Sequence, residues 1–211
     1  EGRGSGSSLR VLRWPHFRRF SIGVLLSLIG NWVEAAAFGY VVLLLGGSAA
    51  QKQQLLPRVA SGEAVLAFAH HEPRARHRMH HVTTRAAAQS DGSFTISGVK
   101  DVVLDGAAAE RLVVSARTSG ANDDRDGISL FLVDPHAPGV TVTRQQLVDH
   151  RSAALVRLDG VKVPADAQVG TLGKGADVID ATLDRATVGL CAEMLGGMVR
   201  AAEMTFAYLK E

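Results

Sequence analysis

LAFAHHEPRARHRMHHVTTRAAAQSDGSFTISGVKDVVL, residues 66–104, decides the fold of this chain because it joins a Glu-Pro turn, a histidine-rich basic loop and β-type alternation in one segment. Apolar and polar residues alternate from Ser93 to Ser97, Gly98 interrupts the alternation, and residues 102–104 resume it. This pattern predicts two antiparallel strands.

Short β-type runs separated by turn residues continue through the following part of the chain. Further strands are expected at residues 112–116, 128–133, 140–143 and 155–158, each bounded by Gly, Asp, Asn or Pro. Many short strands at close spacing favour a sandwich or barrel. After residues 170–175 the apolar residues recur at three- and four-residue steps, which predicts one amphipathic helix of about 35 residues. A helix of that length needs partner helices that a small β-domain does not supply.

The bulk composition excludes several classes of protein. A chain of 211 residues with 46% hydrophobic residues can bury a core, so wholesale disorder is not expected. The formal net charge is +2, and the basic clusters lack the aromatic residues of a nucleic-acid platform, so nucleic acid is not expected as a partner. The single cysteine, Cys191, cannot form an internal disulfide, which fits a reducing compartment such as the cytoplasm.

The first part of the chain has a different character. Residues 1–8 are rich in Gly and Ser and predict a flexible tail. Residues 9–46 hold four arginines and then an apolar run, interrupted by Asn31 and Glu34, that is long enough to cross a bilayer of about 30 Å. A membrane partner through residues 20–45 is therefore one interpretation, with membrane association as the alternative location. A buried amphipathic helix pair is the other interpretation.

Several motifs in fixed order resemble the middle domain of the acyl-CoA dehydrogenases. They are Glu72-Pro73, Thr84-Arg85-Ala86, Gly98-Val99-Lys100, Ala116-Arg117-Thr118, residues 127–133, Pro138-Gly139-Val140 and residues 161–164. The nearest type is the small-subunit branch acting on pimeloyl-CoA-type substrates. The resemblance implies an α+β chain in which a β-barrel middle domain (residues 47–168) follows an apolar helical segment (9–46). The long helix (169–211) would then begin a truncated helical bundle.

The segment from residue 11 to residue 49 resembles the first transmembrane helix of a major-facilitator transporter. Residues 17–20, 27–32 and 47–49 have that pattern, although no second apolar run of about 18 residues follows. Residues 47–57 also fit a helical element that precedes the middle domain in the dehydrogenases. The hypothesis that joins both observations is a chimeric chain with its junction between about residues 43 and 49.

The dehydrogenase resemblance implies FAD as the cofactor. The flavin-contacting positions carried over from the family are Phe68, His70, His71, Val102 and Leu104. Three of them depart from the family pattern, because His71 and Leu104 replace threonines and Val102 replaces a tryptophan. A histidine at position 71 keeps one hydrogen-bonding group for the ring.

The basic loop, residues 74–78, takes the place of a Gly/Ser/Asp loop that lies against the acyl-CoA thioester in the family. His77 and Arg78 are therefore the expected substrate-binding residues, and a basic loop would attract CoA phosphates. The alternative is a solvated, mobile loop. A metal site formed by His77, His81 and Glu72 is disfavoured, because the neighbouring arginines repel a dication and Pro73 opposes a helix.

No catalytic residue is assigned, because the family's catalytic glutamate is expected after Glu211 or at Ala186, which offers no base. The expected function is FAD-dependent α,β-dehydrogenation of an acyl-CoA thioester by a fragment that lacks the base. The expected partners are acyl-CoA, FAD and other subunits bound through the C-terminal helices. The alternative is a catalytically inactive, membrane-anchored binding module or a chimeric transporter-dehydrogenase chain.

Overall fold

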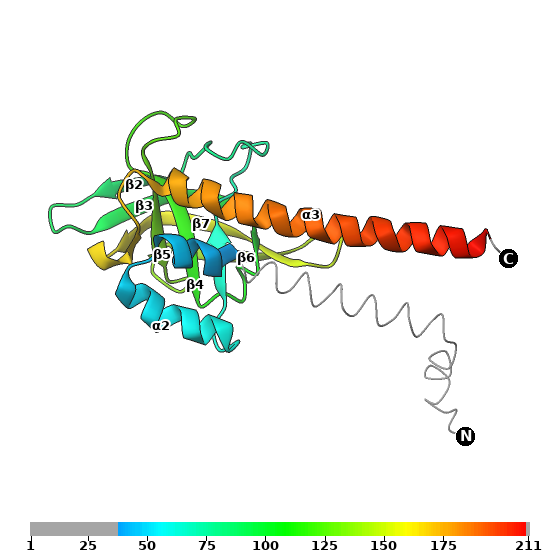
Figure 1. Ribbon diagram of the computed structural model, residues 1–211. Helices are drawn as coiled ribbons and strands as arrows, with labels where there is room; N and C mark the ends of the chain where they lie inside the picture. Colours follow the sequence, from blue (N-terminus) through cyan, green and yellow to red (C-terminus); the bar gives the residue numbers. More distant parts are fainter. Residues whose placement is uncertain (1–37, 210–211) are drawn as a thin grey trace, which may run out of the picture. The chain divides into compact units, whose positions relative to one another are not determined.

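The computed structural model describes residues 38–209 (Figure 1), and the figure labels α2, α3 and the strands β2 to β7. Residues 38–46 are helical. The elements that follow are α2 (Ala49–Ala60), β1 (Leu66–Ala69), β2 (Arg85–Ala88), β3 (Phe94–Leu104), β4 (Arg111–Arg117), β5 (Ile128–Val133), β6 (Val140–Gln146), β7 (Ser152–Val163), the 3-10 turn η2 (Ala165–Ala167), β8 (Gln168–Val169) and α3 (Gly175–Tyr208). The expected tail and most of the segment interpreted as a membrane span lie outside the described residues. Among residues 38–209, no helix has both the length and the apolarity needed to span a membrane.

The strands of residues 38–209 form one mixed sheet that stays open. Its order is β6-β7-β3-β2-β4-β5-β8, and β1 pairs with β4 off this path. The expectation of a barrel is wrong, because the end strands β6 and β8 do not pair with each other. β8 has 2 residues, and β6 exposes much of a polar sequence, VTVTRQQ. Short length and polar side chains are common protections of an edge strand against further pairing.

The alternating part of the quoted stretch forms one strand, β3, where two were expected. Residues 94–104 pair with β7, with one register shift before Gly98 and another after Lys100. The antiparallel partner of the first half of β3 is β2, in which Arg85 faces Ser97. The prediction of two strands is wrong because bulges absorb the interruption at Gly98, so the backbone continues in the same ladder.

The other predicted elements are confirmed as β4, β5, β6, β7 and α3, and the core lies in two clusters. One cluster, which includes Phe131, is made from the strands of the sheet and the segments next to them. The second joins the helices to the sheet through Leu43 from residues 38–46, Leu55 of α2 and Ile179 of α3. Residues 38–46 therefore pack in the same core as the β-domain.

The start of α2 is fixed by its own sequence. Ser48 is the N-cap, and its side chain accepts from the backbone N–H of Gln51 while the Gln51 side chain accepts from the N–H of Ser48. This reciprocal capping box satisfies two N–H groups that a helix start leaves unpaired. Gln51 Nε2 also donates to the carbonyls of Asp166 and Gln168, at 2.8 and 2.9 Å. The cap thus anchors α2 to the segment between β7 and α3.

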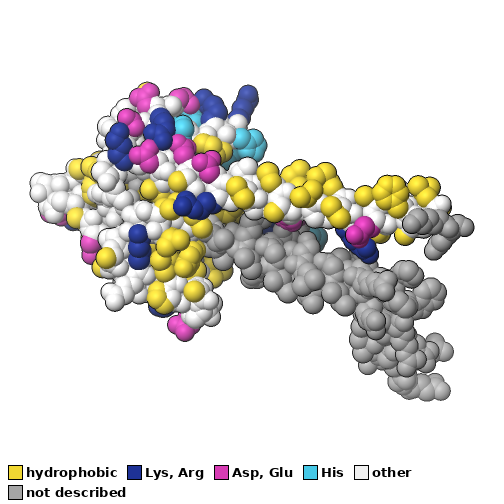
Figure 2. All heavy atoms as spheres, viewed as in Figure 1, with side chains coloured by type: hydrophobic (Ala, Val, Ile, Leu, Met, Phe, Trp, Pro, Cys, Tyr) yellow, Lys and Arg dark blue, Asp and Glu magenta, His cyan; other side chains and the backbone are white. Residues whose placement is uncertain are grey.

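Most of α3 extends beyond the β-domain. Its buried residues all lie in the first turns, and every residue from Thr187 to Tyr208 is exposed (Figure 2). The large apolar side chains exposed there are Val188, Leu190, Met194, Leu195, Met198, Val199, Met204, Phe206 and Tyr208. Burial of an apolar face is what normally stabilises a helix in water. That α3 packs against partner helices or a second chain therefore remains a prediction, and the exposed apolar side chains agree with it.

Replacing Gly98 by alanine is expected to lower the free energy of unfolding by about 2 kcal/mol. The new Cβ would lie 2.4 Å from Thr84 Oγ1 and 2.7 Å from Thr84 Cα, and the backbone atom cannot rotate away. Urea unfolding followed by far-UV circular dichroism measures the change. Gly189→Ala is the matched control, since no atom lies within 4 Å of its Cβ and alanine is the better helix former. Equal stability of the two variants would contradict the close approach of Thr84.

Candidate functional site

A buried ion pair joins the end of β1 to the middle of β3. Lys100 Nζ donates to Glu72 Oε1 at 2.6 Å, and both side chains are fully buried. Thr84 donates its backbone N–H to Oε1 at 3.1 Å, and Thr83 donates its N–H to Oε2 at 2.7 Å and its hydroxyl to the same oxygen. Both carboxylate oxygens are therefore hydrogen-bonded, which is what allows a charge to be buried.

Lys100 also belongs to a hydrogen-bond chain that ends at His70. Its Nζ donates to Ser115 Oγ at 2.9 Å and to the His70 carbonyl at 3.3 Å, so all three ammonium protons have acceptors. The Ser115 hydroxyl lies 2.9 Å from His70 Nδ1, and the tautomer of the imidazole decides which of the two groups donates. Nδ1 of His70 is therefore engaged inside the protein.

The surroundings fix the charge state of each group in this network. Burial alone would raise the pKa of Glu72, but the Lys100 charge and the hydrogen bonds from Lys100, Thr83 and Thr84 lower it to about 2. Burial lowers the pKa of Lys100 to about 8, against the opposing effect of Glu72. Burial, with the Lys100 charge second, lowers the pKa of His70 to about 3. At neutral pH the network holds a carboxylate, an ammonium and a neutral imidazole.

Acidification is expected to destabilise the fold in two stages. The unfolded chain protonates His70 near pH 6.5 whereas the folded chain resists protonation to about 3, so stability is lost between those values as the pH falls. The depressed pKa of Glu72 contributes stability that is present above about 4.5 and lost as the pH falls toward about 2. Urea unfolding at about pH 7, 5.5 and 3.5 measures both losses of stability. The variant His70→Asn is expected to reduce only the loss between about pH 7 and 5.5. If that loss is unchanged in the variant, protonation of His70 is not its cause.

The histidines at the end of β1 lie close together. The rings of Phe68 and His70 are stacked, with centroids 5.3 Å and planes 6° apart. The His71 carbonyl accepts from the N–H of Asp101 at 2.9 Å, which ties this segment to β3. The His77 ring lies 6.0 Å from that of His71. His71 Nδ1 is buried and, among the described residues, has no hydrogen-bond partner.

The two other expected flavin positions lie at the bulged end of β3. Val102 has φ 49°, a left-handed conformation that a β-branched residue rarely adopts, and its side chain is 38% exposed. Asp101 Oδ1 accepts from the Val102 N–H at 2.9 Å and from Gln145 Nε2 at 3.2 Å, which braces the bulge. The bond between Asp101 and His71 places Val102 beside the histidines, whereas Leu104 pairs with β7 two residues further on.

The basic loop is tied to two neighbouring segments. Asp123 Oδ1 accepts from Arg78 Nη1 at 2.7 Å and lies 2.8 Å from His81 Nδ1. His80 Nε2 lies 2.8 Å from an oxygen of Asp180, in the first turns of α3. These pairs are at least partly exposed, so each contributes about 0–1 kcal/mol. Together they tie residues 78–81 to Asp123 and to the first turns of α3.

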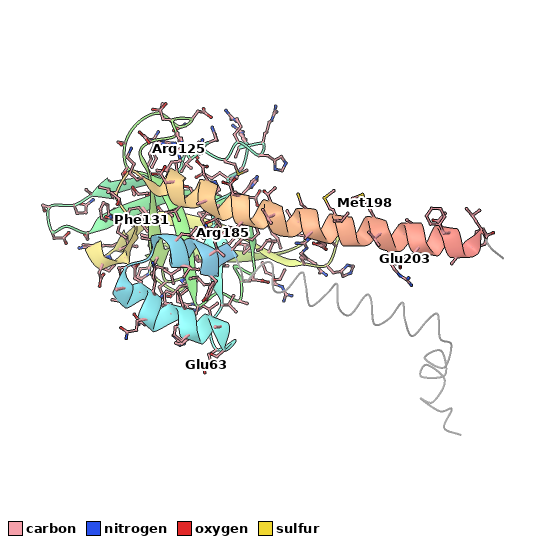
Figure 3. All side chains as sticks on the ribbon, viewed as in Figure 1. Glu63, Arg125, Phe131, Arg185, Met198 and Glu203 are labelled. Carbon is pink, nitrogen blue, oxygen red and sulfur yellow. The ribbon has the colours of Figure 1, made fainter. Side chains whose placement is uncertain are left out.

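Residues 119–126, which include Asp123, are held from both sides. Arg125 donates to Asp177 and Asp180 near the start of α3 (Figure 3). Arg117, which is buried, donates from below to backbone carbonyls at 2.8 to 3.4 Å. Its acceptors are Val82, Ser119, Asp126, His80, Asn122 and Asp124. One guanidinium therefore holds residues 80–82 and 119–126 together.

Sequence reasoning identified Glu72 and Lys100 as motif positions but did not pair them, and it gave no role to Ser115 or Arg117. One signal was available. Lys100 and Arg117 are charged residues within β-type runs, and a buried charge requires a partner. The identity of each partner depends on strand register and loop geometry, which the sequence does not display.

His77, His81 and Glu72, the residues considered above as a disfavoured metal site, do not form a ligand set. Residues 72–81 form successive turns, so the helix face that His77 and His81 would have shared is not formed. Across residues 38–209, no group of three or more His, Cys, Asp or Glu side chains is placed to hold a metal ion.

Comparisons with known proteins confirm the expected resemblance at the level of the domain. Residues 67–161 match the family model of the acyl-CoA dehydrogenase middle domain. The chain is 35% identical over 158 residues to a probable acyl-CoA dehydrogenase, FadE10, of Mycobacterium bovis, covering 73% of this chain and 24% of that protein. It is 29% identical over 216 residues to an acyl-CoA dehydrogenase of Bacillus subtilis, covering 100% of this chain and 55% of that protein.

A solved structure agrees with this assignment. The butyryl-CoA dehydrogenase of Megasphaera elsdenii superposes with a TM-score of 0.71 and 28% identity, over 78% of this chain and 44% of that one. The chain therefore spans between about a quarter and about half of the length of the relatives named here. The comparisons give no support to the pimeloyl-CoA-type branch or to a transporter helix.

Proposed function

We propose that this chain forms the flavin- and thioester-facing part of an FAD-dependent acyl-CoA dehydrogenase, which oxidises the Cα–Cβ bond of an acyl-CoA. The match of residues 67–161 to the middle domain supports the reaction class. The observation that carries the cofactor assignment is His71 Nδ1, a buried ring nitrogen without a hydrogen-bond partner among the described residues. It stands where the resemblance implies a contact with the flavin.

The residues around His71 fit a flavin ring. A buried polar atom without a partner costs about 1–3 kcal/mol, and the polar edge of a flavin offers such a partner. Val102 follows Asp101, which bonds His71, and it provides an exposed apolar side chain on backbone held in a conformation typical of functional sites. Phe68 and His70 would support His71 from the strand, and Leu104 would extend the surface along β3. When bound, FAD supplies the centre that accepts a hydride, while the protein supplies binding and orientation.

The buried carboxylate beside this surface does not act as the base. Glu72 accepts hydrogen bonds at both oxygens, and its pKa is lowered to about 2, so it has little tendency to take an α-proton. The helical position at which the resemblance offers a base is Ala186. We therefore assign Glu72 and Lys100 to holding the ends of β1 and β3 in register, and assign no base within residues 38–209.

Three finer proposals follow from the resemblance. His77 and Arg78 would contact the thioester part of the substrate, in keeping with the position of the basic loop beside His71. The exposed apolar length of α3 would pack against further helices or subunits. A cytoplasmic location and a pimeloyl-type acyl group remain proposals of the same kind. The alternatives of a membrane-anchored module and a transporter chimera gain no support from the comparisons.

The experiment is a titration of the full chain with FAD, followed by flavin fluorescence. We expect saturable binding that His71→Ala weakens about tenfold, the effect of losing one hydrogen bond to a buried group. His136→Ala is the matched control, because His136 is exposed on the loop after β5. We also expect the chain alone not to reduce an electron acceptor with butyryl-CoA.

Two results would count against the proposal. The cofactor assignment fails if FAD does not bind, or if the losses in His71→Ala and His136→Ala are equal. Reduction of an acceptor by the chain alone would show that a base lies among its residues, and the proposal of a fragment without a base would then be wrong.

A further inference from the structure

A bulge near the end of β3 holds Val102 in a strained conformation. The register with β7 shifts after Lys100, so that Asp101 and Val102 together face a single residue of β7. Val102 has φ 49°, in a left-handed region that a β-branched residue rarely occupies. Strained backbone persists only where its surroundings keep it in place. The bulge therefore needs a restraint that the ladder of β3 and β7 does not supply.

Asp101 supplies this restraint through three hydrogen bonds. Its Oδ1 accepts from the N–H of Val102 at 2.9 Å, and its own N–H donates to the His71 carbonyl at 2.9 Å. The same Oδ1 accepts from Gln145 Nε2 at 3.2 Å. Asp101 is thus the residue through which Val102, His71 and Gln145 are connected.

Gln145 reaches Asp101 from a strand that does not pair with β3. In the sheet, β7 lies between β6 and β3, and Ala153 of β7 faces Gln145 on one side and Leu104 on the other. Residues that face each other on adjacent strands point to the same side of a sheet, and the small methyl group of Ala153 leaves room for a longer side chain to cross. The amide of Gln145 therefore links β6 to the bulge of β3 over the strand between them.

The Gln145 side chain is only half satisfied. Its Oε1 is buried and has no hydrogen-bond partner within residues 38–209, and His71 Nδ1 is in the same state. A buried polar atom without a partner destabilises a fold, so each such atom in a native protein calls for an explanation. Both residues bond to Asp101. Strain at Val102 and two unpaired polar atoms thus gather around one aspartate, which is typical of a functional site.

We propose that Asp101 and Gln145 are positioning residues that hold Val102 and His71 in the arrangement that binds a flavin ring. Asp101 holds both residues directly. Gln145 acts through Asp101, because its amide keeps the carboxylate turned toward the Val102 N–H. A surface that is already in its binding conformation does not lose affinity to ordering when the ligand arrives. The flavin itself comes from the proposed function, on which this inference rests.

The test compares the affinity of the full chain and its variants for FAD, followed by flavin fluorescence. Asp101→Ala is expected to weaken binding about tenfold and Gln145→Ala about fivefold, the effect of losing one or more hydrogen bonds. Asp101→Asn keeps an oxygen that can accept both bonds, so its affinity is expected to stay within about twofold of the parent chain. This rescue separates the position of Oδ1 from its charge. A loss in Asp101→Asn equal to that in Asp101→Ala would overturn the proposal.

The same substitution in a Val102→Gly background gives a readout that a merely structural role of Gln145 would not change. Glycine adopts positive φ without strain, so the brace has little left to hold at this position. Gln145→Ala is therefore expected to weaken FAD binding by less than about 1.5-fold in that background. Equal losses in the two backgrounds would show that Gln145 acts independently of Val102, and the proposal would be wrong.

The matched control is Gln146→Ala, which removes the same kind of side chain from the next residue of β6. Gln146 is exposed and, by the alternation of a strand, lies on the other face. An equal loss of FAD affinity in this variant would assign the effect to β6 in general and overturn the proposal. Amide exchange without FAD gives a second readout. Residues 101–104 should exchange about fivefold faster in Gln145→Ala and at an unchanged rate in Gln146→Ala.

The outcomes separate this inference from the proposed function. If the parent chain binds FAD and Gln145→Ala binds it equally well, the proposed function stands and the positioning role is wrong. If the parent chain does not bind FAD, the proposed function fails and the positioning role fails with it. Faster exchange in Gln145→Ala would then identify a brace of the fold only.

Discussion

Replacing Lys100 by methionine is expected to lower the free energy of unfolding by about 3–5 kcal/mol, the usual cost of removing one partner from a buried ion pair. The Glu72 carboxylate would stay buried, hydrogen-bonded to Thr83 and Thr84 but without an opposing charge. Its pKa, now lowered to about 2, would rise because burial would no longer be opposed by the ammonium. Urea unfolding at about pH 7 measures the loss, and the loss should shrink as the pH falls.

Two further variants test the cause of this loss. Glu72→Gln/Lys100→Met removes both charges and is expected to be more stable than Lys100→Met alone, because no unpaired charge remains buried. Lys162→Met breaks an exposed pair with Asp91 and should cost less than about 1 kcal/mol. If Lys100→Met costs no more than Lys162→Met, the ion pair does not stabilise the fold.

The strands were predictable where the sequence marks their ends. Turn residues bound β4 and β5 closely, and the change from alternating to helical period locates α3, whereas β7 (Ser152–Val163) extends well beyond the expected residues 155–158 at both ends. β3 was not predictable in the same way, because Gly98 resembles the end of a strand and only the ladder to β7 shows that the chain continues. The same ladder leaves the sheet open, since closure depends on which edges meet and not on the number of strands.

The candidate site was predictable as a region but not as a set of contacts. Resemblance to a family indicated Phe68, His70 and His71, and the structure places them together. The resemblance could not indicate that Ser115 and Lys100 engage His70 while His71 keeps a buried nitrogen without a partner among the described residues. Such differences between adjacent histidines depend on distances of a few ångströms between separate strands.

The second large effect is expected at Arg117. Arg117→Met would leave the carbonyls of residues 80–82 and 119–126 without their shared donor, and a loss of about 3 kcal/mol is expected. These loop segments can open to water and so recover part of the lost hydrogen bonding. Amide hydrogen exchange should therefore become faster on substitution, and the increase in exchange rate should be larger in residues 119–126 than in β7. This effect is expected in addition to the change in urea unfolding.

The control for this variant is Arg157→Met, an exposed arginine of β7 that is expected to change stability by less than about 0.5 kcal/mol. Faster exchange throughout the sheet would show global destabilisation and would reject Arg117 as a local clamp. Since Arg78 and His81 rest on Asp123, release of residues 119–126 should also loosen the basic loop. CoA binding should then weaken more than FAD binding in Arg117→Met, because the proposed substrate-binding residues His77 and Arg78 lie in that loop and His71 is held separately by Asp101.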